Sequence, residues 1–136
     1  MQLRVAPEAL SRPVIAALFA LCCCLGACQA SSRDVGITWA IEPARPAVET
    51  VATVRFTLQN DRGEALRGAR LRLAAHMSHP GMTPIAARVI DRGNGIYESR
   101  LELSMAGQWT VVVSGELADG RRITRQTAVA VVAPAP

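Results

Sequence analysis

Residues 52–58 read ATVRFTL, and this short alternating stretch decides the fold class of the chain. Its apolar side chains fall at every second position, namely Ala52, Val54, Phe56 and Leu58. Successive side chains of a β-strand point to opposite faces of the sheet, so one face of this stretch is apolar and the other is polar. One-sided burial of this kind is typical of an antiparallel sheet that packs on a core with a single face. We therefore predict a half-buried strand here.

The same period-two pattern continues on both sides of this stretch, and no segment shows the period of a helix. Turn-forming residues separate the alternating runs at 61–64, 91–95 and 119–120. Strands are predicted near 35–41, 49–60, 68–76, 86–91, 95–103, 108–116 and 121–133. This number of short strands on about 100 residues predicts an all-β fold, an immunoglobulin-like antiparallel β-sandwich of about seven strands.

All four cysteines lie near the amino terminus, at Cys22, Cys23, Cys24 and Cys28, so the chain beyond Cys28 contains none. This distribution excludes disulfides and thiolate metal sites from the predicted sandwich. A metal ion bound there would be held by histidine, methionine, carboxylate or backbone groups.

Residues 1–27 have the features of an export signal peptide. Arg4 and Arg12 lie upstream of an apolar run from Val14 to Ala27, which is too short to span a bilayer as a stable anchor. Residues 25–28 read LGAC, which resembles a bacterial lipobox, the tetrad that is cut before a cysteine that receives lipids. Cys28 is therefore predicted to be lipidated, followed by a tether over 28–34 and a domain over 35–136. The alternative is an ordinary signal peptide that is cut near 27–30 and gives Cys28 no role.

A lipidated Cys28 would anchor the mature chain to a membrane, because several acyl chains hold more firmly than one. Gln29 follows the cysteine, which resembles the arrangement that Gram-negative bacteria sort to the outer membrane. We expect the protein in the cell envelope, anchored by lipid, facing the periplasm and held on the outer membrane.

The mature chain after this cleavage contains 13 arginines, 10 acidic residues and no lysine, a net charge of +3. The arginines alternate with apolar residues, as in RLRL at 70–73, which is typical of a solvated sheet face rather than a nucleic-acid patch. No nucleic-acid partner is expected. Contact of an arginine-rich face with anionic lipid headgroups beside the anchor would be incidental.

Residues 76–82 read HMSHPGM and contain both histidines and two of the three methionines that follow Met1. Imidazole nitrogen together with thioether sulfur suits copper, and copper(I) is the first candidate. Pro80 and Gly81 fit the two central positions of a type II turn, so His79 and Met82 would flank the turn and lie close together. The alternative is that the methionines fill gaps in the core and the histidines serve only solubility.

Met105 is predicted to lie at the same end of the sandwich as this segment. The strand over 68–76 ends at His76, the next strand returns, and the strand over 95–103 comes back, so the loop with Met105 reaches the same rim. The predicted copper ligands are His76, His79, Met82 and Met105. Met77 shares parity with the inward residues of the strand before it and is assigned to the lining of the site.

Two longer segments, HMSHPGMTP at 76–84 and GNGIYESRLELSMAGQWTVVVSGEL at 93–117, resemble the YtkA-like or FixH-like domain family. The resemblance covers about residues 37–132 and rests on a methionine-containing loop, a Gly-x-Tyr strand start and a Met-x-Gly-x-Trp corner. It implies an exported, membrane-tethered β-sandwich associated with copper handling or oxidase assembly. It also implies structural roles for Tyr97 and Trp109 and a place for His76, Met82 and Met105 in the metal loop.

No nucleophile stands beside a base in the sequence, and both histidines belong to one loop, so an enzyme is not expected. The sequence favours a membrane-anchored periplasmic copper carrier or chaperone, which exchanges copper with a donating or receiving protein. The alternative from a different class is an envelope interaction module that uses the His/Met loop as a protein contact surface, without metal. On the strand over 108–116, Trp109 falls on the same face as Val111 and Val113 and is predicted to lie in the core.

Overall fold

The computed structural model describes residues 34–134 of the chain. The predicted signal peptide over 1–27, the predicted lipidation site Cys28 and the tether up to residue 33 lie outside the described residues. Within residues 34–134 no helix is both long and apolar enough to cross a membrane.

Seven strands form from the alternating runs of the sequence, each within two residues of its predicted bounds. They are β1 Val35–Glu42, β2 Val51–Asn60, β3 Arg70–His76, β4 Ile85–Gly93, β5 Ile96–Glu102, β6 Gly107–Glu116 and β7 Arg122–Val131. The stretch at 52–58 lies within β2, where its four apolar side chains are buried and Arg55 is exposed. The predicted half-buried strand is confirmed.

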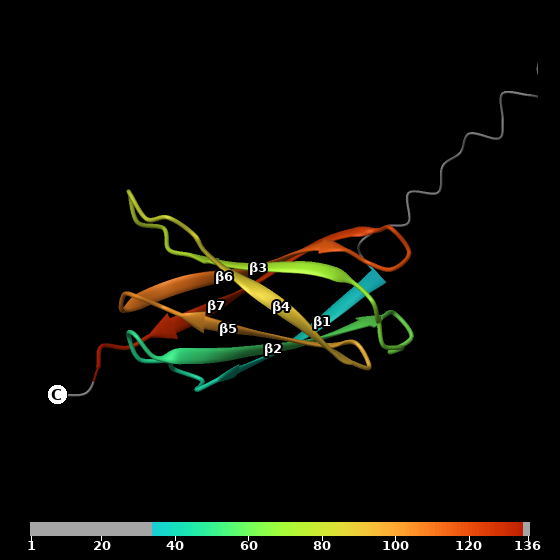
Figure 1. Ribbon diagram of the computed structural model, residues 1–136, viewed down its shortest axis with the longest axis horizontal. Helices are drawn as coiled ribbons and strands as arrows, with labels where there is room; N and C mark the ends of the chain where they lie inside the picture. Colours follow the sequence, from blue (N-terminus) through green and yellow to red (C-terminus); the bar gives the residue numbers. More distant parts are fainter. Residues whose placement is uncertain (1–33, 135–136) are drawn as a thin grey trace, which may run out of the picture.

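All neighbouring strands pair antiparallel, in the order β1-β2-β5-β4-β3-β6-β7. Strand β4 pairs with β3 along Ile85–Arg88 and then with β5 from Val89 to Gly93. It therefore leaves one layer for the other, and Figure 1 shows it running obliquely between them. The result is a sandwich of a β1-β2-β5 layer and a β3-β6-β7 layer, which is the strand arrangement of an immunoglobulin-like domain.

The core lies between these two layers. Every second residue along each strand points into it. Its largest fully buried side chains are Trp109, Tyr97 and Phe56. The rings of Phe56 and Tyr97 stack with centroids 5.6 Å apart, and Trp39 of β1 packs on Phe56 at 5.3 Å. Aromatic contacts of this kind join β1, β2 and β5 into one layer.

The chain order divides the loops between two ends of the sandwich. The tether end contains the start of β1 at Val35 and the connections at 61–69, 94–95 and 117–121. The His/Met end contains the connections at 43–50, 77–84 and 103–106. Figure 1 shows the two sets of loops on opposite sides of the molecule.

Turns at the tether end form where the sequence predicts them. Residues Gly93, Asn94 and Gly95 all have positive φ angles, of 85°, 52° and 71°. The Asp91 Oδ1 atom accepts a hydrogen bond of 2.7 Å from the Gly93 amide. Glycine and asparagine adopt this left-handed backbone at low cost, so these residues close the β4–β5 hairpin.

Tyr97 ties the long β2–β3 connection to the core. Its hydroxyl donates a hydrogen bond of 2.9 Å to the Leu66 carbonyl and accepts one of 3.1 Å from the Ala69 amide. Burial raises the pKa of the Tyr97 phenol; the hydrogen bond from Ala69 opposes this rise and the Asp91 carboxylate adds to it. The neutral phenol is therefore favoured, and the structural role implied for Tyr97 agrees with these contacts.

Candidate functional site

The β3–β4 connection over 77–84 contains the predicted turn. The Met82 amide donates a hydrogen bond of 3.3 Å to the His79 carbonyl, and Gly81 has a φ angle of 85°. A positive φ at the third position is what a type II turn requires, and glycine accepts it without steric cost. The prediction that His79 and Met82 flank a turn is confirmed.

The β5–β6 connection over 103–106 places Met105 on the surface. Met105 is 41% exposed, whereas Trp109, four residues later, is 1% exposed. The Trp109 Nε1–H donates a hydrogen bond of 2.9 Å to the Met105 carbonyl. The indole therefore lies in the core, as predicted, and fixes the backbone of the loop while the Met105 side chain stays outside.

The two loops meet because β3 and β6 are neighbours in the sheet. His76, the last residue of β3, lies opposite Thr110 of β6. Met77 follows and reaches across to the start of β6, where a Cβ atom built on Gly107 would lie only 2.7 Å from the Met77 Cε. A side chain at position 107 would displace Met77, so glycine at this position allows the loops to touch.

The predicted ligands differ in how far they are exposed. His76 is half-buried on the outer side of β3, and His79 is exposed at the turn. Met82 is half-buried and packs on the core, as does Met77. Figure 1 shows the β3–β4 loop projecting from the same end of the sandwich as the β5–β6 loop.

The structure thus brings all five histidine and methionine residues of 34–134 to one end, at the last residue of β3 and in the loops over 77–84 and 103–106, with Met77 reaching the start of β6. Their roles as ligands or lining stay predictions. Within residues 34–134, no group of three or more His, Cys, Asp or Glu side chains is arranged to hold a metal ion. A site at the His/Met end would therefore depend on methionine sulfur as well as on imidazole.

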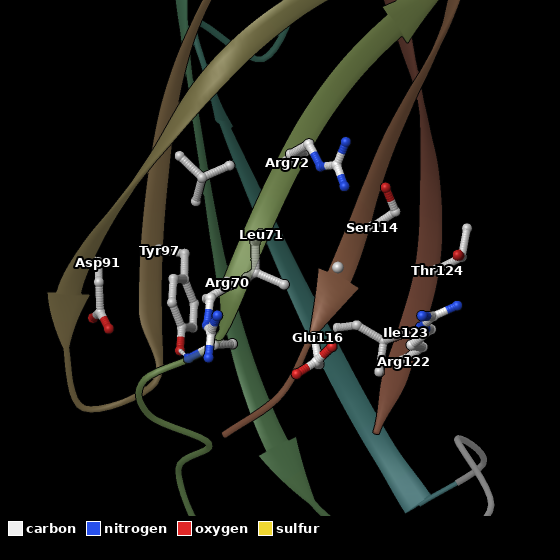
Figure 2. A pocket seen from close by; sticks show the side chains of 13 residues that line it. Arg70, Leu71, Arg72, Asp91, Tyr97, Ser114, Glu116, Arg122, Ile123 and Thr124 are labelled. Carbon is white, nitrogen blue, oxygen red and sulfur yellow. Dashed lines mark hydrogen bonds between the residues drawn. The ribbon is translucent and has the colours of Figure 1, made fainter. Parts of the chain in front are cut away.

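A second feature is a groove at the tether end that sequence reasoning missed. It has a volume of about 710 Å³ and opens where β4 departs from β3. Figure 2 shows the charged side chains that line it, among them Arg70, Arg72, Glu116 and Arg122. The alternation of arginine at 70–73 was the available signal, but alternation alone does not show that a neighbouring strand turns away.

The outer surface of the β1-β2-β5 layer carries an ion-paired cluster. The Glu98 carboxylate contacts Arg92 at 2.7 Å and Arg55 at 3.0 Å. Hydrogen bonds from Arg92 and then from Arg55 hold the pKa of Glu98 below its ordinary value. Glu98 offsets one of the two arginine charges, and the cluster joins β2, β4 and β5.

These features define an immunoglobulin-like β-sandwich domain that presents its histidines and methionines on loops at one end. The chain belongs to the YtkA-like family, whose family model matches residues 32–114. The match ends within β6, short of the end at 132 that the resemblance indicated, although β7 pairs with β6 along its full length. The FixH-like part of the resemblance stays a prediction.

Solved structures of similar shape confirm the predicted fold class. The filamin domain of Lin-41 has a TM-score of 0.54 and 16% identity, covering 75% of this chain and 95% of that one. The Escherichia coli adhesin FdeC has a TM-score of 0.53 and 22% identity, covering 75% of this chain and 32% of that one. Identities this low show a common fold only. No curated protein is significantly similar to the chain in sequence.

Proposed function

We propose that this protein is a copper-binding domain of the cell envelope, which binds one copper(I) ion at the His/Met end and exchanges it with a partner protein. His76, His79, Met82 and Met105 are the proposed ligands, and Met77 lines the site. One observation carries this proposal: every histidine and methionine of residues 34–134 lies at the ends of β3 and β5 or in the loops that follow them. The contact between Met77 and Gly107 joins those two loops.

The chemistry of the donors favours transfer over catalysis. Thioether sulfur is a soft ligand that suits copper(I), and imidazole binds it as well. Neither group in this arrangement stands beside a nucleophile that it could activate. The proposed role is therefore that of a carrier or chaperone, serving copper homeostasis or oxidase assembly, and not that of an enzyme.

Exposure at the His/Met end suits an exchange between two proteins. Met105 at 41% and His79 are open to solvent, so a partner could reach them without unfolding the domain. Val51 and Val132 lie at the same end and are 51% and 41% exposed. Exposed apolar side chains around polar ligands are typical of a docking surface.

These same valines favour a second candidate, an envelope interaction module that contacts its partner without metal. In that case Met105 would act as an apolar contact, and its sulfur would be dispensable. Copper titration of the mature protein separates the two candidates.

The mature protein should bind one equivalent of copper(I) under reducing conditions, in competition with a chromophoric chelator. X-ray absorption of the complex should show both nitrogen and sulfur scatterers. Because imidazole must be deprotonated to bind and thioether does not titrate, affinity should weaken as the solution is acidified from about pH 8 to about pH 5. Zero stoichiometry, or a spectrum with nitrogen and oxygen alone, would contradict the proposal.

Met105→Leu is the matched variant for this test, because it removes sulfur while keeping an apolar side chain of similar volume. Copper affinity should fall in Met105→Leu, and thermal stability should stay near that of the wild type. An unchanged affinity would exclude Met105 from the site and confine the candidate ligands to 76–82.

We further propose that the mature chain is anchored through lipids on Cys28, on the periplasmic side of the outer membrane. With the anchor at the tether end, the strands would hold the copper loops roughly 30 Å from the start of β1, since ten residues of strand span about that length. Cys28→Ala should block lipidation and leave the precursor uncut or cut elsewhere. Mass spectrometry of the amino terminus and membrane fractionation test this, and an amino terminus identical to that of the wild type would exclude a lipoprotein.

A further inference from the structure

The two outer surfaces of the sandwich differ in charge. On the β1-β2-β5 side, including the end of β4, three arginines face three glutamates: Arg55, Arg92, Arg100, Glu42, Glu98 and Glu102. On the β3-β6-β7 side, including the start of β4, four arginines face one glutamate: Arg70, Arg72, Arg88, Arg122 and Glu116. We call this second set of four arginines the arginine face. One surface is therefore balanced and the other is strongly positive.

The arginine face is laid out in two adjacent cross-strand rows. Arg70 of β3 lies opposite Glu116 of β6, which lies opposite Arg122 of β7. In the next row Arg72 lies opposite Arg88 of β4 on one side and Ser114 of β6 on the other. Like charges directly opposite each other repel, so an external anion bound between Arg72 and Arg88 would stabilise this pair.

None of the four guanidinium groups forms an ion pair or a hydrogen bond with another residue of 34–134. On the opposite surface, by contrast, Arg55 and Arg92 are held by Glu98. The groove beside β3 is lined by Arg70, Arg72 and Arg122, by the hydroxyls of Ser114 and Thr124, and by the carboxylates of Asp91 and Glu116 (Figure 2). Three positive and two negative side chains leave its lining with a net charge of +1. The exposed Arg88 adds to the positive charge of this side. Guanidinium groups beside hydroxyls are well suited to phosphate oxygens.

The position of these four arginines near the tether end favours a membrane as the source of the anion that they would bind. Both rows lie in the half of the β3-β6-β7 surface nearest the tether end, where the chain enters the domain at Val35. The other half carries uncharged residues such as Ala74, Val112 and Gln126. A membrane that holds the chain by its amino-terminal side would face this half first.

We propose that the arginine face binds the headgroups of an anionic phospholipid bilayer, so that the β3-β6-β7 surface lies against the membrane. The proposal goes beyond copper binding and does not depend on it, but its choice of a membrane as the partner rests on the proposed lipid anchor at Cys28. Docking of this kind leaves the His/Met end, on the far side of the two rows, outside the membrane contact.

The test uses the mature chain with Cys28→Ser, which cannot be lipidated, so that binding reports the folded surface alone. It should bind vesicles of phosphatidylglycerol and not vesicles of phosphatidylcholine, and the binding should weaken with added salt. Each arginine near such a surface contributes about fivefold to partitioning, so Arg72→Gln/Arg88→Gln should lower it by roughly 25-fold.

The matched control is Arg55→Gln/Arg100→Gln, which removes the same charge from the opposite surface. It should lower partitioning by no more than about threefold, because those arginines would face away from the vesicle. Circular dichroism melts confirm that both variants fold. Equal losses in the two double variants, or equal binding to the two lipids, would overturn the proposal. Binding to a short DNA duplex as tight as binding to phosphatidylglycerol would also overturn it, because the surface would then be a general polyanion site.

Discussion

The two ends of this sandwich are held in different ways. At the tether end, side chains tie the turns: Tyr97 bonds to Leu66 and Ala69, and Asp91 bonds to Gly93. At the His/Met end, the Trp109 side chain ties the connection at 103–106, and backbone hydrogen bonds such as that from Glu49 to Leu103 tie the connection at 43–50. The connection at 77–84 differs, because one hydrogen bond forms within it, between the Met82 amide and the His79 carbonyl. Because it has fewer hydrogen bonds, the loop over 77–84, which carries His79 and Met82, is expected to open locally at a lower free energy than the rest of the domain. A sandwich whose other connections are held by hydrogen bonds can thus present an adaptable loop at 77–84.

The largest expected effect comes from Trp109, a large core side chain that is hydrogen-bonded to the backbone of the His/Met end. Trp109→Ala removes a side chain that is 1% exposed and its hydrogen bond to the Met105 carbonyl. We expect a loss of about 3–5 kcal/mol in the free energy of unfolding. Urea unfolding of the copper-free protein measures it. A loss below about 1 kcal/mol would mean that the His/Met end does not depend on its core.

Tyr97→Phe should have the next largest effect, at the tether end. It leaves the aromatic ring in place but removes the hydroxyl that donates to Leu66 and accepts from Ala69. Loss of such hydrogen bonds costs about 1–3 kcal/mol, because partly buried backbone groups lose their partner. Urea unfolding gives the cost, and hydrogen exchange of the Ala69 amide shows where it arises. Faster amide hydrogen exchange at the His/Met end instead would show that the loss of the Tyr97 hydroxyl is not confined to the tether end.

Met105→Ala should change stability least among the three substitutions. Its side chain is 41% exposed, and the backbone carbonyl that Trp109 binds is retained. The expected cost is below about 1 kcal/mol, as for most surface positions. Thermal melting beside Trp109→Ala makes the comparison direct. A melting temperature as low as that of Trp109→Ala would place Met105 in the core rather than at a binding rim.

The ion-paired cluster around Glu98 gives the smallest effect, and it depends on pH. Arg92 and Arg55 hold the pKa of Glu98 below its ordinary value, so the folded state binds this proton less readily than the unfolded state. The resulting stability is present above the unfolded pKa and is lost as the pH falls through the folded pKa. Carboxyl-carbon NMR titration should find the Glu98 pKa below 4.5 in the wild type and closer to it in Arg92→Ala. Equal values in both proteins would contradict the pairing.

Much of the fold could be predicted because strand alternation is a local signal. All seven strands, and turns such as the one at 93–95, follow from residue order and from glycine at positions of positive φ. The departure of β4 from β3 could not be predicted in this way. Its alternation continues unbroken from Ile85 to Ile90, across the point where β4 leaves β3. Only contacts with distant strands decide which neighbour each half pairs with. The groove was missed for the same reason, and the arginines at 70–73 were predicted only as part of a solvated sheet face.

The candidate site was predicted as a location rather than as a geometry. Chain order alone places the loop after β5 at the same end as the loop after β3, so the convergence of Met105 with 76–82 could be inferred. The contact between Met77 and Gly107 depends on the register of β3 against β6, in which His76 meets Thr110. Register and side-chain rotamers in loops are decided by packing, which the sequence pattern does not contain.

The path of β4 makes the sandwich one continuous sheet with two outer edges, β1 and β7, and these edges turn toward each other. The Arg125 Nη2 donates a hydrogen bond of 3.0 Å to the Val35 carbonyl, and Ala47 pairs in parallel with Val132 just beyond β7. An open edge strand is a template on which a second molecule can add its own strand. The bond from Arg125 and the bridge at Val132 each cover part of an edge, so they shorten the stretch of open strand that a neighbouring copy could extend.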